Sequence, residues 1–267
     1  MRVKVNDIEI HYELKGKGKT VVFINGLTSD TTSWYYQIQC FLQKYQVLTY
    51  DCRGQGQSGR PIQKKYSTKI HANDLNALLG TLGIQKVHLI GLSNGGLIAQ
   101  KFAFYYPKKL GALVLVSTPA YMDSRLRLIT MSWITATKIG GAVLRFDVAM
   151  PLIFGRNFLN NKLLLKKLRE RCKNLDISAN ILTSLIKGME FLSPYQRRKI
   201  LAPTLVIAGD DDILIPVEHA KALAREIPKA ELLILNNCGH NCAIERPEEF
   251  NYFVLNFLQR YDNLLSI

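Results

Sequence analysis

Short apolar runs alternate with stretches of helical period along most of the chain. The apolar runs predict strands at 20–25, 46–51, 87–92, 112–116, 203–209 and 231–236, after a hairpin formed by 3–5 and 8–14. Apolar residues spaced three and four apart predict helices at 31–44, 67–82, 96–106, 218–227 and 247–260. Strands that alternate with helices are typical of a sheet covered on both faces. We therefore predict an α/β fold with a mostly parallel, eight-stranded sheet.

The alternation stops in the middle of the chain. Helical patterns fill 123–139 and 161–173, and a third helix is expected to begin with Asp176 as its cap. A helical insertion between two strands of a parallel sheet is expected to lie over the strands' carboxyl ends. We predict a core made of 1–119 and 197–267, with a helical cap at 120–196.

One strand runs directly into Gly91-Leu92-Ser93-Asn94-Gly95, and a helix follows at once. Strand, Gly-x-Ser-x-Gly turn and helix, in this order, are the pattern of a nucleophile elbow. Small flanking residues allow the strained turn that exposes the serine hydroxyl. Ser93 is therefore the candidate nucleophile; a bystander serine in a glycine-rich turn is the alternative.

A serine hydroxyl needs a base to take its proton and an acid to orient that base. In chains with this elbow the order is Ser, then Asp or Glu, then His, which leaves His219 and His240 as bases. His240 follows a strand in a Gly-flanked loop, whereas His219 is expected to face solvent. Among the three consecutive aspartates we select Asp212 as the acid, and we expect Asp210 and Asp211 to face solvent or a basic partner.

Several other polar residues have simpler interpretations. Asp51 and Arg53 are expected to pair and to fix the loop that follows their strand, while His11 alternates onto a polar strand face. His71 is interpreted as a surface or packing residue. Cys238 and Cys242 flank His240, and we favour packing over a zinc site because no fourth ligand is nearby in the sequence.

Five motifs in this order resemble those of the α/β-hydrolase superfamily, in the esterase and lactonase branch that has a helical cap. They are Asn25-Gly26-Leu27, Asp51-x-Arg53-Gly54-x-Gly56-x-Ser58, Gly91-x-Ser93-x-Gly95-Gly96, Gly209-x-x-Asp212-x-x-x-Pro216 and Gly239-His240. The resemblance implies Ser93, Asp212 and His240 as the catalytic triad. It also implies an oxyanion hole formed by the backbone N–H groups of Leu27 and Asn94, and no cofactor. Trp34, which follows the first motif, is the predicted substrate contact.

Two positions depart from that pattern. The family usually has His where this chain has Asn25, and again His where it has Gln55. Neither residue belongs to the triad, so we interpret both as changes in the support of the loops. These loops border the pocket, so the departures leave the substrate class open.

The net charge of +14 is concentrated in one part of the chain. Residues 120–199 hold 15 Lys and Arg against 5 Asp and Glu. Such a patch favours an acidic partner. It lacks the interleaved aromatic residues typical of nucleic-acid binding. Five scattered cysteines and the lack of an apolar leader or an 18-residue apolar run predict a cytoplasmic protein without a spanning segment.

These observations predict a serine hydrolase of carboxylic esters. Similar relatives include esterases that cleave a pimeloyl methyl ester held on an acidic acyl carrier protein, and enol-lactonases. A carrier protein could dock on basic residues of the cap, namely Arg125, Arg127, Lys166, Lys167, Arg169 and Arg171. The alternatives are an enol-lactonase, an esterase of small molecules, or a non-catalytic receptor built on the same fold.

Overall fold

An eight-stranded sheet runs through the molecule in the spatial order β1-β2-β4-β3-β5-β6-β7-β8. The computed structural model describes residues 1–175 and 177–265. The strands are β1 (Arg2–Val5), β2 (Ile8–Lys15), β3 (Thr20–Ile24), β4 (Gln46–Tyr50), β5 (Val87–Leu92), β6 (Leu110–Val116), β7 (Thr204–Gly209) and β8 (Ala230–Leu235). The first two strands pair antiparallel, β2 pairs antiparallel with β4, and β3 to β8 are parallel to one another. The predicted α/β fold with a mostly parallel sheet is confirmed.

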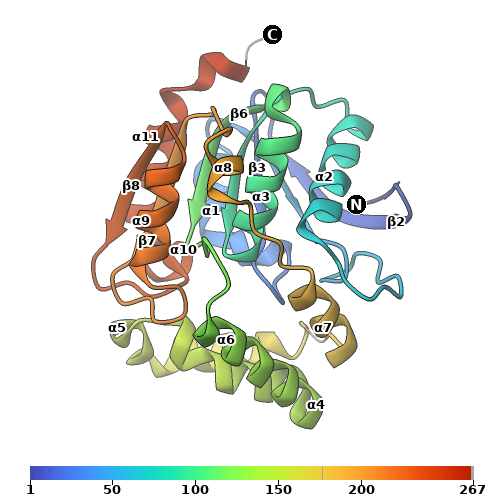
Figure 1. Ribbon diagram of the computed structural model, residues 1–267, viewed down its shortest axis with the longest axis vertical. Coiled ribbons are helices and arrows are strands. Elements are labelled where there is room, and N and C mark those ends of the chain that lie inside the picture. Colours follow the sequence, from blue (N-terminus) through green and yellow to red (C-terminus); the bar gives the residue numbers. More distant parts are fainter. Residues whose placement is uncertain (176, 266–267) are drawn as a thin grey trace.

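Helices cover both faces of this sheet (Figure 1). One face packs against α2 (Thr68–Thr81), α3 (Asn94–Tyr105) and α9 (Val217–Glu226). The other face packs against α1 (Tyr35–Phe41), α10 (Cys242–Glu245) and α11 (Pro247–Gln259). The buried strands supply both cores by alternation; Val22 and Ile24 face the first core, and Val21 and Phe23 face the second.

Short 3₁₀ helices complete the connections: η1 (Thr31–Trp34), η2 (Pro107–Lys109) and η3 (Asp262–Leu265). The predicted helix at 31–44 is therefore shorter than expected, because its first turn is η1 and its α-helical part ends at Phe41. Ser67 caps α2, since its side chain accepts a hydrogen bond from Ile70 N–H.

The described residues between β6 and β7 form five helices: α4 (Ser124–Ile153), α5 (Arg156–Leu159), α6 (Lys162–Cys172), α7 (Ala179–Lys187) and α8 (Pro194–Arg197). Figure 1 shows α4 to α7 together below the sheet, at the end opposite the C-terminus, and we call these four the cap helices. Helix α8 packs instead against α3 and α9. The limits 120–196 of a separate cap stay a prediction.

Helix α4 extends beyond the predicted end at 139. Its backbone is non-helical at Gly140 and Gly141, where φ of Gly141 is +63°, and it resumes helical geometry up to Ile153. Helix α7 begins after Ser178, whose side chain accepts a bond from Ile181 N–H. The predicted cap residue Asp176 lies outside the described residues. Within the described chain, no helix combines the length and apolar character that crossing a bilayer requires.

Candidate active site

Ser93 occupies a strained turn between β5 and α3. Its φ of +55° and ψ of −116° lie in a region that side-chain-bearing residues rarely adopt. A Cβ atom on Gly91 would lie 2.5 Å from the carbonyl oxygen of Gly95, and one on Gly95 would lie 2.2 Å from that of Ile24. Only glycine fits at either position, so the two glycines of the motif permit the close approach of strand and helix that the turn requires.

Asp212 and His240 meet across the loops that follow β7 and β8. The Nδ1 atom of His240 lies 2.8 Å from Oδ2 of Asp212. The other carboxylate oxygen of Asp212 accepts backbone N–H bonds from Leu214 (3.0 Å) and Ile215 (2.8 Å), which fix the carboxylate in place. Asp212 and His240 are 4% and 5% exposed. With Nδ1 oriented by the carboxylate, Nε2 is the ring atom available to a reacting group.

Ser93 and His240 line the same cavity, which has a volume of about 160 Å³. We call the loops at the carboxyl ends of the strands the sheet-edge loops. They contribute Gly26, Leu27 and Thr28 to the wall of the cavity. The opposite wall comes mainly from the cap helices and the residues next to them. It is apolar except for two arginines, Arg145 and Arg171, and its apolar members are Trp133, Ala142, Phe146, Ala149, Ile153, Phe154, Leu168 and Leu175. The cavity therefore brings a hydroxyl, an oriented imidazole and a small apolar space together.

The two residues predicted to supply oxyanion donors lie beside Ser93. A Cβ atom on Gly26 would lie 3.6 Å from that of Ser93, and the next residue, Leu27, lines the cavity. Asn94 is the first residue of α3, so its backbone N–H has no partner within the helix. The positive end of the α3 dipole lies at the same point. Donation by both groups stays a prediction.

The predicted substrate contact at Trp34 is wrong. Its side chain is buried at 1% exposure, packs on Phe23 with ring centroids 4.8 Å apart, and belongs to the core under the sheet. The indole Nε1–H donates to Oδ1 of Asn25 over 2.6 Å. Trp34 therefore supports the loop that carries Leu27 and does not line the cavity.

The expected pair between Asp51 and Arg53 is also wrong. Arg53 makes a two-point ion pair with buried Asp74 of α2, at 2.8 Å for both bonds, and it also binds Asp7. Burial alone would lower the pKa of Arg53, but its bonds to Asp74 and Asp7 raise it. Both partners of Arg53 come from segments far away in the sequence, which the motif does not contain.

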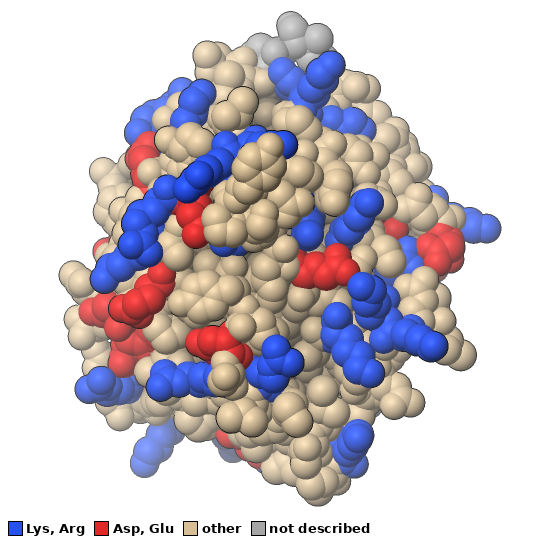
Figure 2. Space-filling view, in the orientation of Figure 1, with Lys and Arg blue, Asp and Glu red and all other residues tan. Residues whose placement is uncertain are grey.

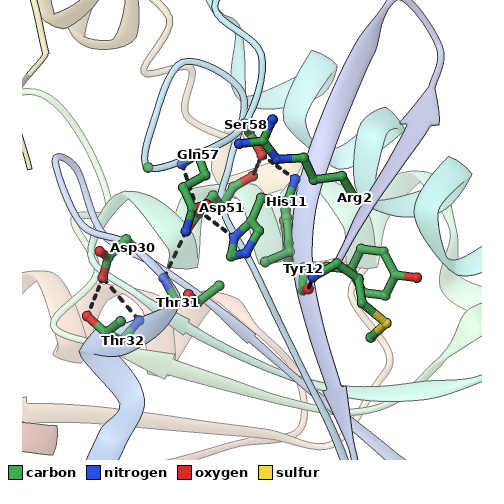
Figure 3. A network of polar contacts seen from close by, with 12 residues as sticks. Arg2, His11, Tyr12, Asp30, Thr31, Thr32, Asp51, Gln57 and Ser58 are labelled. Atoms are coloured by element: carbon green, nitrogen blue, oxygen red, sulfur yellow. Dashed lines mark hydrogen bonds and ion pairs between the residues drawn. The ribbon is translucent and has the colours of Figure 1, made fainter.

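Asp51 instead forms the centre of a buried network, shown in Figure 3. Its Oδ2 lies 2.9 Å from Nδ1 of His11 and accepts Gln57 N–H, and its Oδ1 accepts Thr31 N–H. Burial raises the pKa of this carboxyl group. His11 is thus buried at 9% exposure and is not a solvated strand residue, because Asp51 of the loop after β4 contacts its side chain.

Two further histidines are buried. His219 was expected to face solvent but is 2% exposed, and its Nδ1 accepts Ala120 N–H over 3.2 Å. The start of the segment after β6 covers it, which a helical pattern alone does not reveal. His71 is a packing residue at 2% exposure; burial lowers its pKa to about 3.

The remaining acidic and thiol groups near His240 have structural contacts. Asp211 pairs with Arg156 and accepts its backbone N–H, and Asp210 accepts Cys238 N–H. Cys238 and Cys242 are fully buried, and both sulfurs lie near the carbonyl oxygen of Gly239. Within the described residues, no group of three or more His, Cys, Asp or Glu side chains is arranged to hold a metal ion.

Two arginines line the cavity wall: Arg145, which the sequence did not single out, and Arg171, which was predicted only as a docking residue of the cap. Arg145 of α4 is buried and bonds to the carbonyl oxygen of Leu175 at 3.2 Å. Arg171 of α6 pairs with Asp30 at 3.0 Å, which joins a cap helix to the loop that begins at Asn25. The only available signal was the basic character of 120–199, which does not distinguish a pocket residue from a surface one.

Comparisons with known proteins agree with this architecture. Residues 19–247 match the family model of the alpha/beta hydrolase fold. A 2-hydroxy-6-oxononadienedioate/2-hydroxy-6-oxononatrienedioate hydrolase of Paraburkholderia phymatum is 29% identical, over 94% of this chain and 91% of the relative. An esterase from Thermogutta terrifontis is 27% identical with a TM-score of 0.88, over 98% of this chain and 99% of that one. MGS-M2, an alpha/beta hydrolase enzyme from a Medee basin deep-sea metagenome library, is 28% identical with a TM-score of 0.89, over 97% of each chain.

The sheet order, the strained serine at the end of β5 and the match over most of the length lead to one assignment. This chain belongs to the alpha/beta hydrolase family and is an enzyme of the hydrolase class.

Proposed function

We propose that the protein cleaves carboxylic esters by covalent catalysis at Ser93. The observation that carries this proposal is the 2.8 Å contact between His240 Nδ1 and Asp212 Oδ2, made by a histidine that shares its cavity with Ser93. A carboxylate that fixes the tautomer of an imidazole leaves Nε2 to act as a base toward a hydroxyl. An adjacent base of this kind activates a serine hydroxyl for acyl transfer.

In the proposed reaction, Ser93 Oγ attacks the ester carbonyl carbon while its proton passes to His240 Nε2. The negative oxygen of the tetrahedral intermediate accepts the N–H groups of Leu27 and Asn94. His240 then gives its proton to the leaving alcohol oxygen as the C–O bond breaks. Water attacks the acyl-serine as His240 removes its proton, and His240 returns that proton to Ser93 Oγ as the acid departs. No cofactor takes part in these steps.

The size of the cavity limits the group that enters it. A cavity of about 150 Å³ holds benzene in an engineered protein, and the cavity beside Ser93 measures about 160 Å³. We therefore propose that the reacting end of the substrate is apolar and holds roughly six non-hydrogen atoms. A longer remainder would extend out of the cavity.

A methyl ester on an acidic acyl carrier protein, such as a pimeloyl ester, stays our proposal for the physiological substrate. Of the six candidate docking residues, Arg169 pairs with Asp147 and Arg171 pairs with Asp30. The other four are exposed on α4 and α6: Arg125, Arg127, Lys166 and Lys167. Figure 2 shows Lys and Arg spread over this face of the molecule, including the lower part that the cap helices occupy in Figure 1, where Asp and Glu residues also lie. Strong loss of rate with salt, for the carrier substrate alone, would support docking.

The test is a substrate panel with wild-type protein and Ser93→Ala. The panel contains p-nitrophenyl acetate and hexanoate, an enol-lactone, a carrier-bound methyl ester, and 2-hydroxy-6-oxononadienedioate because of the relative named for that compound. We expect ester turnover and labelling by a fluorophosphonate, both abolished in Ser93→Ala. Ester turnover that persists in Ser93→Ala would contradict the mechanism. If the dienedioate is the only compound that the protein turns over, its hydrolysis is the function and the ester proposal is wrong.

A further inference from the structure

The residue that follows Leu27 in its loop has a strained backbone conformation. Thr28 has a φ of +58°, in the left-handed region that a β-branched residue rarely adopts. Thr28 also lines the cavity, together with Gly26 and Leu27. Such strain persists only where surrounding contacts determine the conformation. The contacts that hold Thr28 therefore decide where the neighbouring N–H of Leu27 points.

The contact that holds Thr28 comes from Gln55. The backbone N–H of Thr28 donates to Oε1 of Gln55 over 2.5 Å. Gln55 is fully buried, in the turn after β4. Its Nε2 has no hydrogen-bond partner among the described residues, so Oε1 is the side-chain atom through which this buried amide supports the loop. Burying an amide with an unsatisfied N–H group destabilises the fold, and the bond from Thr28 N–H to Oε1 offsets part of that cost.

The same turn holds the loop at a second point. Asp51 accepts the N–H of Thr31 over 2.8 Å, three residues beyond Thr28 (Figure 3). Asp51 also binds His11 and Gln57 N–H, so its replacement would disturb the whole network. At the start of the loop, the Asn25 side chain donates to the carbonyl oxygen of Tyr50 over 3.2 Å. Of these supports, Gln55 is the one that acts on the residue next to Leu27.

We infer that Gln55 is a positioning residue, which aims the N–H of Leu27 at the developing oxyanion by holding Thr28 in its left-handed conformation. This inference rests on the proposed function, because it presupposes a tetrahedral intermediate at Ser93. Gln55 lies behind the loop and does not line the cavity. It therefore acts through the loop and not on the substrate.

The test compares Gln55→Met with Gln57→Met. Methionine has nearly the length of glutamine, but its thioether sulfur is a much weaker hydrogen-bond acceptor than an amide oxygen. Gln57 lies in the same turn, with an exposed side chain, and only its backbone contacts Asp51. The measurements are kcat and KM for p-nitrophenyl acetate, Ki for an aryl trifluoromethyl ketone, which forms a tetrahedral adduct with serine, and the thermal midpoint.

For Gln55→Met we expect kcat to fall by about 10- to 100-fold, with KM within about twofold, because misaligned groups at the reacting centre cost about this factor. The Ki for the ketone should rise by the same factor. Gln57→Met should match wild type. Should Gln55→Met not fold, Gln55→Asn serves, because it keeps a polar amide but withdraws the acceptor by one methylene; we expect the same pattern.

Ser93→Ala, measured in parallel, separates the two hypotheses. If Ser93→Ala is inactive while the Gln55 variants keep wild-type kcat and Ki, the positioning role is wrong and the proposed function stands. If kcat falls but Ki for the ketone does not change, Gln55 has a structural role only. If Ser93→Ala remains active, the proposed function itself fails.

Discussion

The sheet-edge loops and the cap helices border one cavity from opposite sides, but they are built differently. The loops hold buried polar groups with defined partners, such as Asp212, whose carboxylate contacts His240 and two backbone N–H groups. The cap helices contribute a mostly apolar wall, which includes Arg145 and Arg171, and several of their other charged side chains are exposed. Changes in the loops should therefore alter the rate with every substrate, whereas changes in the cap should alter the choice among substrates.

The largest effect is expected at Asp212. Asp212→Asn preserves the shape of the side chain but gives His240 Nδ1 an amide partner, which favours the wrong imidazole tautomer. We expect kcat to fall by about 10⁴-fold, as in serine proteases with the equivalent change. The measurement is turnover of several p-nitrophenyl esters, and the factor should be similar for all of them.

Asp211→Asn is the matched control for this change. Asp211 lies next to Asp212, but its carboxylate binds Arg156 of the cap segment and not His240. We expect turnover close to wild type. Equal losses of kcat in the two variants would show that the aspartates matter only for the conformation of this turn. That result would contradict the role assigned to Asp212.

The next effect concerns stability and contrasts a buried ion pair with an exposed one. Arg53 and Asp74 have side chains 1% and 2% exposed, and they join the turn after β4 to α2. Arg53→Met leaves Asp74 buried without its cation, and breaking such a pair costs about 3–5 kcal/mol in the free energy of unfolding. The change in the free energy of unfolding is measured by urea denaturation, monitored by circular dichroism.

Arg169→Met provides the corresponding change in the cap. Arg169 makes a two-point pair with Asp147, with bonds of 2.7 and 2.8 Å, but both side chains are exposed. Water and salt screen exposed pairs, so we expect no measurable shift of the urea midpoint. A shift as large as that of Arg53→Met would show that the cap is held as rigidly as the sheet-edge loops.

The same contrast explains what could be predicted from the sequence. The strands and the elbow depend on local patterns, and the chain order of the motifs selected Asp212 and His240, which the structure brings into contact. The partners of Arg53 and Asp51 could not be read in this way. Asp74 lies 21 residues after Arg53, and His11 lies 40 residues before Asp51.

Burial also escaped prediction where other segments provide the cover. His11 lies on strand β2, His219 on helix α9 and Trp34 in η1, and neighbouring elements from elsewhere in the chain bury all three. In the cap, the second half of α4 was missed because Gly140 and Gly141 interrupt the pattern. The residues that shape the substrate pocket therefore came from the part of the chain with the fewest sequence signals.

The smallest effect should be a change in substrate preference on replacing Phe146. This residue lies in the second half of α4 and lines the cavity wall opposite the loops. Phe146→Ala should enlarge the apolar space and favour p-nitrophenyl hexanoate over acetate by about tenfold in relative kcat/KM, since even one methylene group placed in a hydrophobic pocket contributes about 1–3 kcal/mol. Val148→Ala on the same helix, whose side chain is 38% exposed, should leave the preference unchanged. A uniform fall in kcat for both esters in Phe146→Ala would mean that the cap helps to align the reacting groups. The cap would then set the rate as well as the choice of substrate, which would contradict the proposed difference between loops and cap.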